Sequence, residues 1–123
     1  MQLAAQCPDA NPADLKNFID ELPEGLVGVD FSPADLILAG RQPRDFAETL
    51  GPHIVHVFAN DAVRGLGGPR GGDVELGRGS ADFPELLGAL EEHNYQGWVT
   101  IERRNSQQPV EEVENAVQFL HSL

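Results

Sequence analysis

The sequence predicts an α/β fold in which a parallel sheet is covered by helices, and two observations support this prediction. Four strand-like apolar runs alternate with four helix-like segments along the chain, and this alternation is typical of parallel sheets. Within the strand-like runs, apolar residues alternate with more polar ones. A doubly wound sheet needs two apolar faces, whereas the interior of a barrel carries polar side chains near its site. The pattern therefore favours a barrel over an open sheet.

Each helix-like segment has a start signal and an apolar stripe at helical spacing. Asn11 and Asp82 are suitable N-caps, and Pro12, Pro43 and Pro109 suit the first helical position. The helices are expected at 12–22, 43–50, 83–90 and 109–120. The strands are expected at 3–6, 26–31, 54–58 and 97–102. A long loop that carries seven glycines is expected from Asn60 to Ser80.

Alternation within the strands predicts which residues share a face of the sheet. The face covered by helices is expected to hold Leu3, Ala5, Val27, Val29, Phe31, Val55, Val57, Val99 and Ile101. The inner face is expected to hold Ala4, Gln6, Gly28, Asp30, Ser32, His56, Phe58, Thr100 and Glu102.

Length and charge narrow the class of protein. At 123 residues the chain is expected to form one domain, and a net charge of −12 disfavours binding to nucleic acid. The sequence contains no membrane-length apolar run and no signal-peptide pattern at its start, so a cytoplasmic location and no membrane association are expected. The single cysteine, Cys7, excludes an internal disulfide and a cysteine-rich zinc site. Arg64, Arg70 and Arg78 form the one basic cluster, which is either a solvated loop or an anion contact.

Four segments, in order and at matching spacings, resemble one known family. They are residues 27–36, 54–62, 74–84 and 94–103. Together they are similar to the sugar-phosphate isomerase/epimerase branch of the xylose-isomerase-like TIM barrels. The resemblance implies that residues 1–123 form a single half-barrel domain, which corresponds to strands five to eight of the family barrel. A complete barrel of eight βα units needs about 250 residues.

The same resemblance implies where a metal site would lie. Members of the family hold a divalent metal such as Mn or Mg with Glu, Asp, His and Glu at the strand ends. Those positions fall on Gln6, Ser32, Phe58 and Glu102. Only Glu102 is unchanged, as a retained catalytic position, so we expect no bound metal and no other cofactor.

Three further residues are candidates for substrate binding through the resemblance: Arg64, Asp61 and His56. A relocated metal site of Asp30, His56 and Glu102 is an alternative to a hydrogen-bonded polar layer around Asp30 and His56. The glycine-rich segment 65–72 is interpreted either as a phosphate-binding loop or as a lid over the barrel mouth.

Two function classes follow from the sequence. The first is a non-catalytic binding or assembly protein, with a homodimer or a partner half-barrel and a small sugar or polyol as the expected partners. The second is a metal-dependent sugar isomerase or epimerase that a partner chain completes. A nucleic-acid module like the abasic-site endonucleases of the superfamily is disfavoured by the acidic charge. Since four strands cannot close a barrel, we expect an association that shields Phe58 and Trp98 from water.

Overall fold

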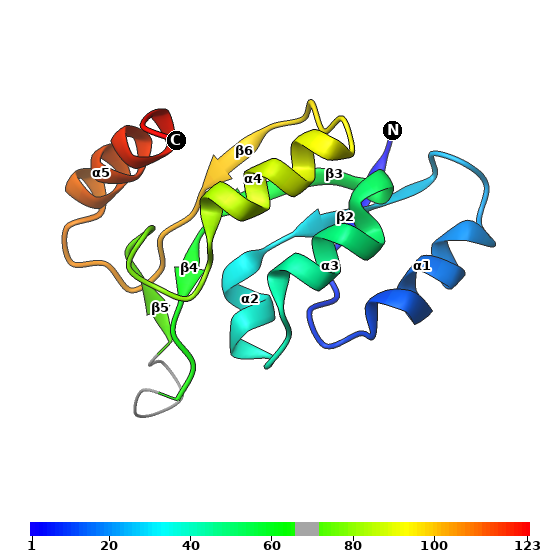
Figure 1. Ribbon diagram of the computed structural model, residues 1–123, viewed down its shortest axis with the longest axis horizontal. Helices are drawn as coiled ribbons and strands as arrows, with labels where there is room; N and C mark the ends of the chain where they lie inside the picture. The colour runs from blue at the N-terminus through cyan, green and yellow to red at the C-terminus, as the bar shows by residue number, and fades with distance from the viewer. Residues whose placement is uncertain (66–71) are drawn as a thin grey trace.

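Four parallel strands form the main sheet of the computed structural model, which describes residues 1–65 and 72–123. Their order in space is β1-β2-β3-β6, and each strand is parallel to its neighbour (Figure 1). The strands are β1 (Leu3–Ala5), β2 (Val27–Phe31), β3 (Ile54–Ala59) and β6 (Val99–Ile101). The predicted parallel α/β arrangement and its four strands are confirmed.

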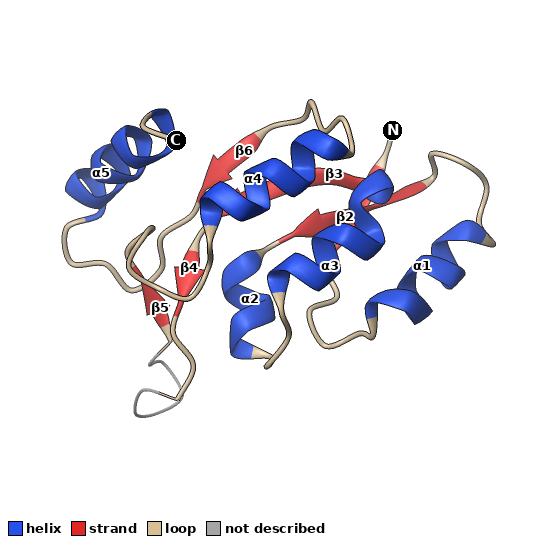
Figure 2. Cartoon of the chain, in the orientation of Figure 1, coloured by secondary structure: helices blue, strands red, loops and turns tan. Residues whose placement is uncertain are grey.

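The four predicted helices are also confirmed, and local capping explains where two of them begin. The Asn11 side chain accepts hydrogen bonds from the backbone N–H groups of Ala13 and Asp14, and Asp82 accepts from Glu85. Helix α3 packs between α1 and α4 in front of the sheet (Figure 2). The helices are α1 (Pro12–Asp20), α3 (Pro43–Leu50), α4 (Phe83–Glu92) and α5 (Pro109–His121). None of the helices in the described residues is long and apolar enough to cross a membrane.

Two short elements were not predicted. Helix α2 (Pro33–Leu38) follows β2 directly, with proline at its first position, and a 3₁₀ turn, η1 (Gly51–His53), follows α3. Helix α2 lies at the carboxyl end of β2 and so brings its first turn to the edge of the sheet where the candidate site lies.

The core lies between the sheet and the helices. Val29, Phe31, Val57 and Ala59 are fully buried on this face, and the ring of Phe31 stacks on that of Phe46, with 5.9 Å between centroids. The inner face is more open, as expected from its polar residues. There Asp30, His56 and Phe58 are half-buried and Thr100 is exposed.

The predicted face of Val55 is wrong, because β3 contains a β-bulge. Val29 pairs with Ile54, whereas the next residue, Asp30, pairs with His56, so Val55 is the extra residue. Its side chain turns to the inner face and packs over Gly28, where there is no room for a Cβ atom. Ile54 takes its place in the buried core.

The predicted long loop from Asn60 to Ser80 contains an antiparallel strand pair, which corrects the sequence interpretation. β4 (Asp61–Ala62) pairs with β5 (Asp73–Val74), and short polar sequences of two residues give no periodic signal. Residues 66–71 lie outside the described residues. The interpretations of segment 65–72 as a lid or a phosphate loop, and any role of Arg70, lie there too.

The buried side chain of Asp61 stabilises the segment after β3 that contains β4 and β5, hereafter called the excursion. It is fully buried, and its two oxygens accept hydrogen bonds from the backbone N–H groups of Ala62, Gly77, Gly79 and Ala81, at 2.9 to 3.1 Å. Four donors satisfy both oxygens of a carboxylate, which can only accept hydrogen bonds when ionised. The side chain therefore joins β4 to the segment that leads into α4.

We expect Asp61→Asn to lower the free energy of unfolding by about 3 kcal/mol, because the amide nitrogen would face backbone donors that it cannot satisfy. Urea denaturation followed by circular dichroism measures this change. Asp45→Asn, at an exposed carboxylate in the first turn of α3, is the matched control and should stay within about 0.5 kcal/mol of the parent. Equal effects of the two substitutions would contradict the structural role of Asp61.

Candidate functional site

Polar side chains meet where the four parallel strands end. Ser32 follows β2 and Asn60 follows β3, and both are 2% exposed. The amide nitrogen of Asn60 donates to Ser32 Oγ at 3.0 Å and to Glu102 Oε1 at 3.1 Å. Asn60 Oδ1 accepts from the backbone N–H of Ala34 at 2.9 Å, which fixes the first turn of α2 at the same place. The carboxyl ends of β2, β3 and β6 are therefore joined by side-chain hydrogen bonds.

Arg104 lies at the centre of this cluster. Its guanidinium binds Asp35 through Nη1 to Oδ1 at 2.8 Å and Nη2 to Oδ2 at 2.9 Å. The same group binds Glu102 Oε1 through Nη2 at 2.8 Å and Nε at 3.1 Å. Such a planar fork matches the geometry of a carboxylate. One cation thus neutralises two acidic side chains that lie close together.

Two further hydrogen bonds complete the cluster at Asp35. Ser32 Oγ donates to Asp35 Oδ2 at 2.7 Å, and the Gln6 amide nitrogen donates to the same oxygen. The hydrogen bonds from Arg104 are the main reason that the pKa of Asp35 lies below its ordinary value, and those from Ser32 and Gln6 act in the same direction. Reciprocally, Asp35 raises the pKa of Arg104. Gln6, Ser32, Asp35, Asn60, Glu102 and Arg104 are hereafter called the strand-end cluster.

Hydrogen bonds of the cluster include three of the predicted metal positions, Gln6, Ser32 and Glu102, whereas the fourth, Phe58, has no polar side-chain atom to join them. Phe58 contacts the ring of His56 edge to face, with 4.6 Å between centroids. It lies two residues before Asn60 on the same strand end and makes no hydrogen bond to the cluster.

A second polar group lies further down the inner face. His56 Nδ1 is 2.7 Å from Asp30 Oδ1, and His56 Nε2 is 2.8 Å from Thr100 Oγ1. A neutral imidazole that donates from Nδ1 and accepts at Nε2 satisfies both contacts. Glu102 instead binds Asn60 and Arg104, and the described residues contain no group of three or more His, Cys, Asp or Glu that could hold a metal ion. These contacts join Asp30, His56 and Thr100 in one hydrogen-bonded polar layer.

The other predicted substrate contacts, Asp61 and Arg64, make different contacts from those of the strand-end cluster. Both oxygens of Asp61 accept backbone hydrogen bonds, so its observed role is structural. The guanidinium of Arg64 packs over Gly40 and lines a hollow with Arg41 and Ser80. Arg78 is 76% exposed and pairs with Glu75.

The sequence interpretation missed Asp35, Asn60 and Arg104. Asp35 stands three residues after Ser32 in an unpredicted helix, and Arg104 stands two residues after Glu102. An acidic and a basic residue just beyond two strand ends were a usable signal, because the carboxyl ends of neighbouring parallel strands meet at one edge.

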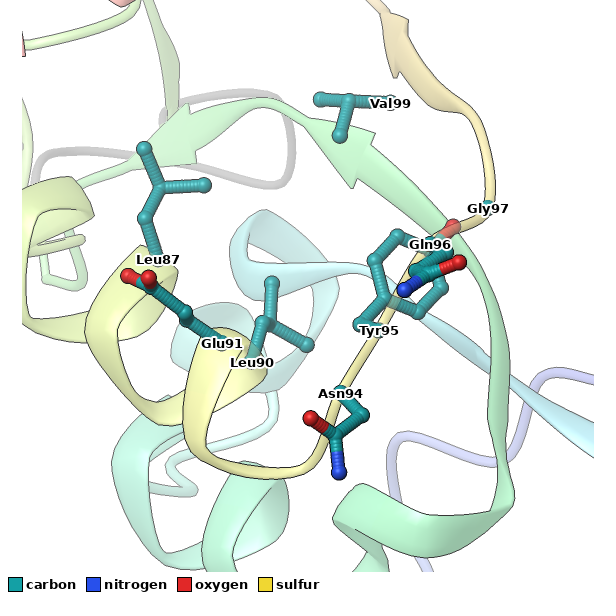
Figure 3. Close-up of a pocket in the computed structure, with 8 residues that line it drawn as sticks. All are labelled: Leu87, Leu90, Glu91, Asn94, Tyr95, Gln96, Gly97 and Val99. Carbon is teal, nitrogen blue, oxygen red and sulfur yellow. The ribbon is translucent and has the colours of Figure 1, made fainter.

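A hollow of about 320 Å³ lies elsewhere, between α4 and the start of β6 (Figure 3). Leu87, Leu90 and Val99 supply apolar side chains, and Tyr95 donates its hydroxyl hydrogen to the carbonyl of Trp98. Burial raises the pKa of Tyr95. The hollow lies at the amino end of β6, on the helix side, and none of the predicted site residues lines it.

Comparison with known proteins gives one family model and several solved structures. The model for xylose isomerase-like TIM barrels matches residues 3–123. A xylose isomerase domain protein from Planctomyces limnophilus is 24% identical, with a TM-score of 0.81 over 95% of this chain and 44% of its own. A xylose isomerase-like TIM barrel protein from Mycobacterium smegmatis, solved in complex with magnesium, is 19% identical, with a TM-score of 0.75 over 99% of this chain and 44% of its own. A 3-keto-D-glucoside 4-epimerase from E. coli is 20% identical, with a TM-score of 0.68 over 92% of this chain and 40% of its own.

An uncharacterised protein from Methanocaldococcus jannaschii is 29% identical over 112 residues, which are 89% of this chain and 36% of that protein. The chain thus spans less than half the length of these relatives. The four βα units found here correspond to half of a barrel that is built from eight. Because the family model matches residues 3–123 of this chain, the chain belongs to the xylose isomerase-like TIM barrel family.

Proposed function

We propose that this chain is a non-catalytic member of its family, in which the guanidinium of Arg104 stands where relatives hold a divalent metal. One observation carries the proposal: Arg104 binds both carboxylates of the strand-end cluster, Asp35 and Glu102, at 2.8 to 3.1 Å. Its role would then be binding or assembly.

The donors present do not fit a divalent cation. Mg²⁺ and Mn²⁺ prefer anionic oxygen, often with an imidazole. Gln6 uses its amide nitrogen towards Asp35, Ser32 donates its hydroxyl hydrogen to the same carboxylate, and Phe58 has no lone pair. Both remaining carboxylates already pair with a cation.

The proton chemistry of an isomerase or epimerase lacks one of its groups as well. By the family resemblance, two glutamates act as acid and base in the epimerase members, and one of these positions holds Gln6, whose amide cannot accept a proton. The cluster still presents the Gln6 amide, the Glu102 carboxylate and the Arg104 guanidinium at its accessible side. These groups suit the hydroxyls of a small sugar or polyol, which is the ligand class we propose.

A second candidate is a metal-dependent sugar isomerase or epimerase that a partner chain completes. Two observations support it. Asp35 and Glu102 lie close enough to share one cation, and proteins of similar fold include one solved in complex with magnesium and one epimerase. Here Arg104 would leave the cluster when metal enters. Metal binding separates the two candidates.

We expect no rise in melting temperature when manganese is added up to about 1 mM, because a ligand that binds only the native state must stabilise it. Differential scanning fluorimetry measures this, with metal analysis of the purified protein alongside. A rise of several degrees at micromolar manganese would support the second candidate and sink the first.

A variant that restores the ligands is the positive control for that measurement. Gln6→Glu, Ser32→Asp and Phe58→His, combined with Arg104→Met, should bind manganese by calorimetry, because anionic oxygens and an imidazole then replace the guanidinium. The same triple change with Arg104 retained should bind more weakly. No binding to the folded quadruple variant would show that these positions are not the family's ligand positions.

The pH dependence of stability should report the Arg104–Asp35 pair. The pKa of Asp35 is lowered in the folded protein, so its contribution is present above the ordinary pKa of about 3.9 and is lost as the pH falls through the lower, folded-state value. Arg104→Met should lower the unfolding free energy at neutral pH by about 1–2 kcal/mol and flatten its fall between about pH 5 and pH 2.

The control for this prediction is Arg44→Met, which removes exposed pairs with Glu48 and Glu85. Exposed pairs contribute little, so this variant should cost less than about 0.5 kcal/mol and should keep the slope of the parent. Urea titrations at stepped pH measure both variants. If the free energy of unfolding of Arg104→Met changed with pH in parallel with that of the parent, the electrostatic role of the cluster would be contradicted.

A further inference from the structure

The main sheet has two free edges, one formed by β1 and the other by β6. β1 is the outer strand at one end and β6 at the other, and all four strands run in the same direction. Free edges carry unpaired backbone groups that can bind another strand. Pairing β6 of one sheet with β1 of the next is the arrangement that keeps all strands parallel and all helices on one face, as a barrel requires.

Hydrogen bonds identify which residues present those backbone groups. The carbonyl of Trp98 and the N–H of Glu102 bond to β3, so the intervening Val99 and Ile101 direct their backbone groups to the free edge. At the other end, the N–H of Leu3 bonds to Leu26, which leaves Ala4 facing outward. Each edge is therefore available for ladder bonds.

Exposed apolar side chains gather beside the same two edges. Near β6, Trp98 is 83% exposed, and the helix that follows exposes Val110, Val113 and Val117. Near β1, Leu3 is 51% and Phe18 of α1 is 58% exposed. Helices α1 and α5 lie at opposite ends of the molecule (Figure 1), and α1 packs on α3. In a barrel, each helix packs between two neighbours around the ring, so α1 and α5, as the outer helices of the described part, each have one position for a further helix.

We infer that a second copy of this chain covers both edges and closes an eight-stranded ring with two-fold symmetry. β6 of each copy pairs with β1 of the other, and α5 of each packs its valine stripe on the partner's α1. The strand count supports this occupant, because two copies with four parallel strands each supply the eight strands of the family barrel. The two strand-end clusters would then face each other across one mouth, so each copy supplies half of any ligand site there.

The charge of the two surfaces predicts how the association responds to salt. Glu111 and Glu114 lie on α5 and Asp14 lies on α1, whereas Glu112 and Asp20 on the same helices pair with Arg103 and Lys16. Like charges would meet across the seam, and salt screens such repulsion. The dimer should therefore tighten as the ionic strength rises, unlike an association held by opposite charges.

Sedimentation velocity on the 123-residue chain tests the inference at about 10 µM, a concentration at which a specific interface forms. We expect the mass of two chains, with a larger dimer fraction at about 0.5 M salt than at about 0.05 M. Trp98 is the sole tryptophan, so acrylamide quenching of its fluorescence should be weak in the dimer. A monomer with freely quenched fluorescence at both salt concentrations would overturn the inference.

Two seam variants test the geometry. Val113→Glu should weaken the dimer by about 100-fold, because two-fold symmetry repeats the change at both seams. Val99→Pro should also weaken it while keeping the ladder to β3, since proline is tolerated where its missing N–H faced the open edge. Leu38→Glu, at an exposed leucine on α2, is the matched control and should leave association unchanged.

Restoration separates this ring from other dimers. Phe18→Lys added to Val113→Glu places opposite charges across both seams and should recover at least about 10-fold of the lost affinity. In a dimer that packs inner face to inner face, the substitutions at Val113 and Phe18 would leave the dimer affinity unchanged, and that result would overturn the inference. The measurement needs neither metal nor substrate, so its failure leaves the proposal on Arg104 untouched.

Discussion

One guanidinium group ties together the carboxyl ends of the strands. Arg104 holds Asp35 and Glu102 at once, and through Asp35 it reaches Gln6 at the end of β1. Two carboxylates at hydrogen-bonding distance from a common point repel each other unless a cation lies between them. In a metal-binding barrel the ion meets that need, whereas here a side chain of the same chain does so. The inner half of the fold therefore depends on a charge that the sequence itself encodes.

The proposed replacement of a metal ion by Arg104 would change what the strand-end cluster can do. A metal ion has coordination positions that a ligand can enter and leave, but a guanidinium committed to two carboxylates has few donors free. Further down, Asp30, His56 and Thr100 satisfy one another. Both layers are thus internally paired. A ligand would meet a neutralised, hydrogen-bonded surface rather than an electrophile.

The fold was predictable because its signals are local. Prolines and N-caps such as Asn11 mark where helices begin, and strand periodicity marked the two faces of the sheet. The predicted face of Val55 was wrong because a β-bulge depends on how two strands pair, and the sequence of one strand does not encode that pairing. The convergence of Gln6, Ser32 and Glu102 followed from strand order, whereas Asp35 and Arg104 joined them through the geometry of a short helix and a loop. Propensity is weakest in such segments, and only the tertiary structure brings them together.

The hydrogen bonds of Asp61 also bear on how the chain can change. The excursion after β3 is closed at its base, since Val63 donates to the carbonyl of Gly72 at 2.7 Å and Asp61 clamps Gly77, Gly79 and Ala81. One side chain thus fixes three separate points of the chain beyond β4, and any change at Asp61 would release all of them together. Variation in this part of the fold is therefore constrained through a single carboxylate rather than through the two short strands that it supports.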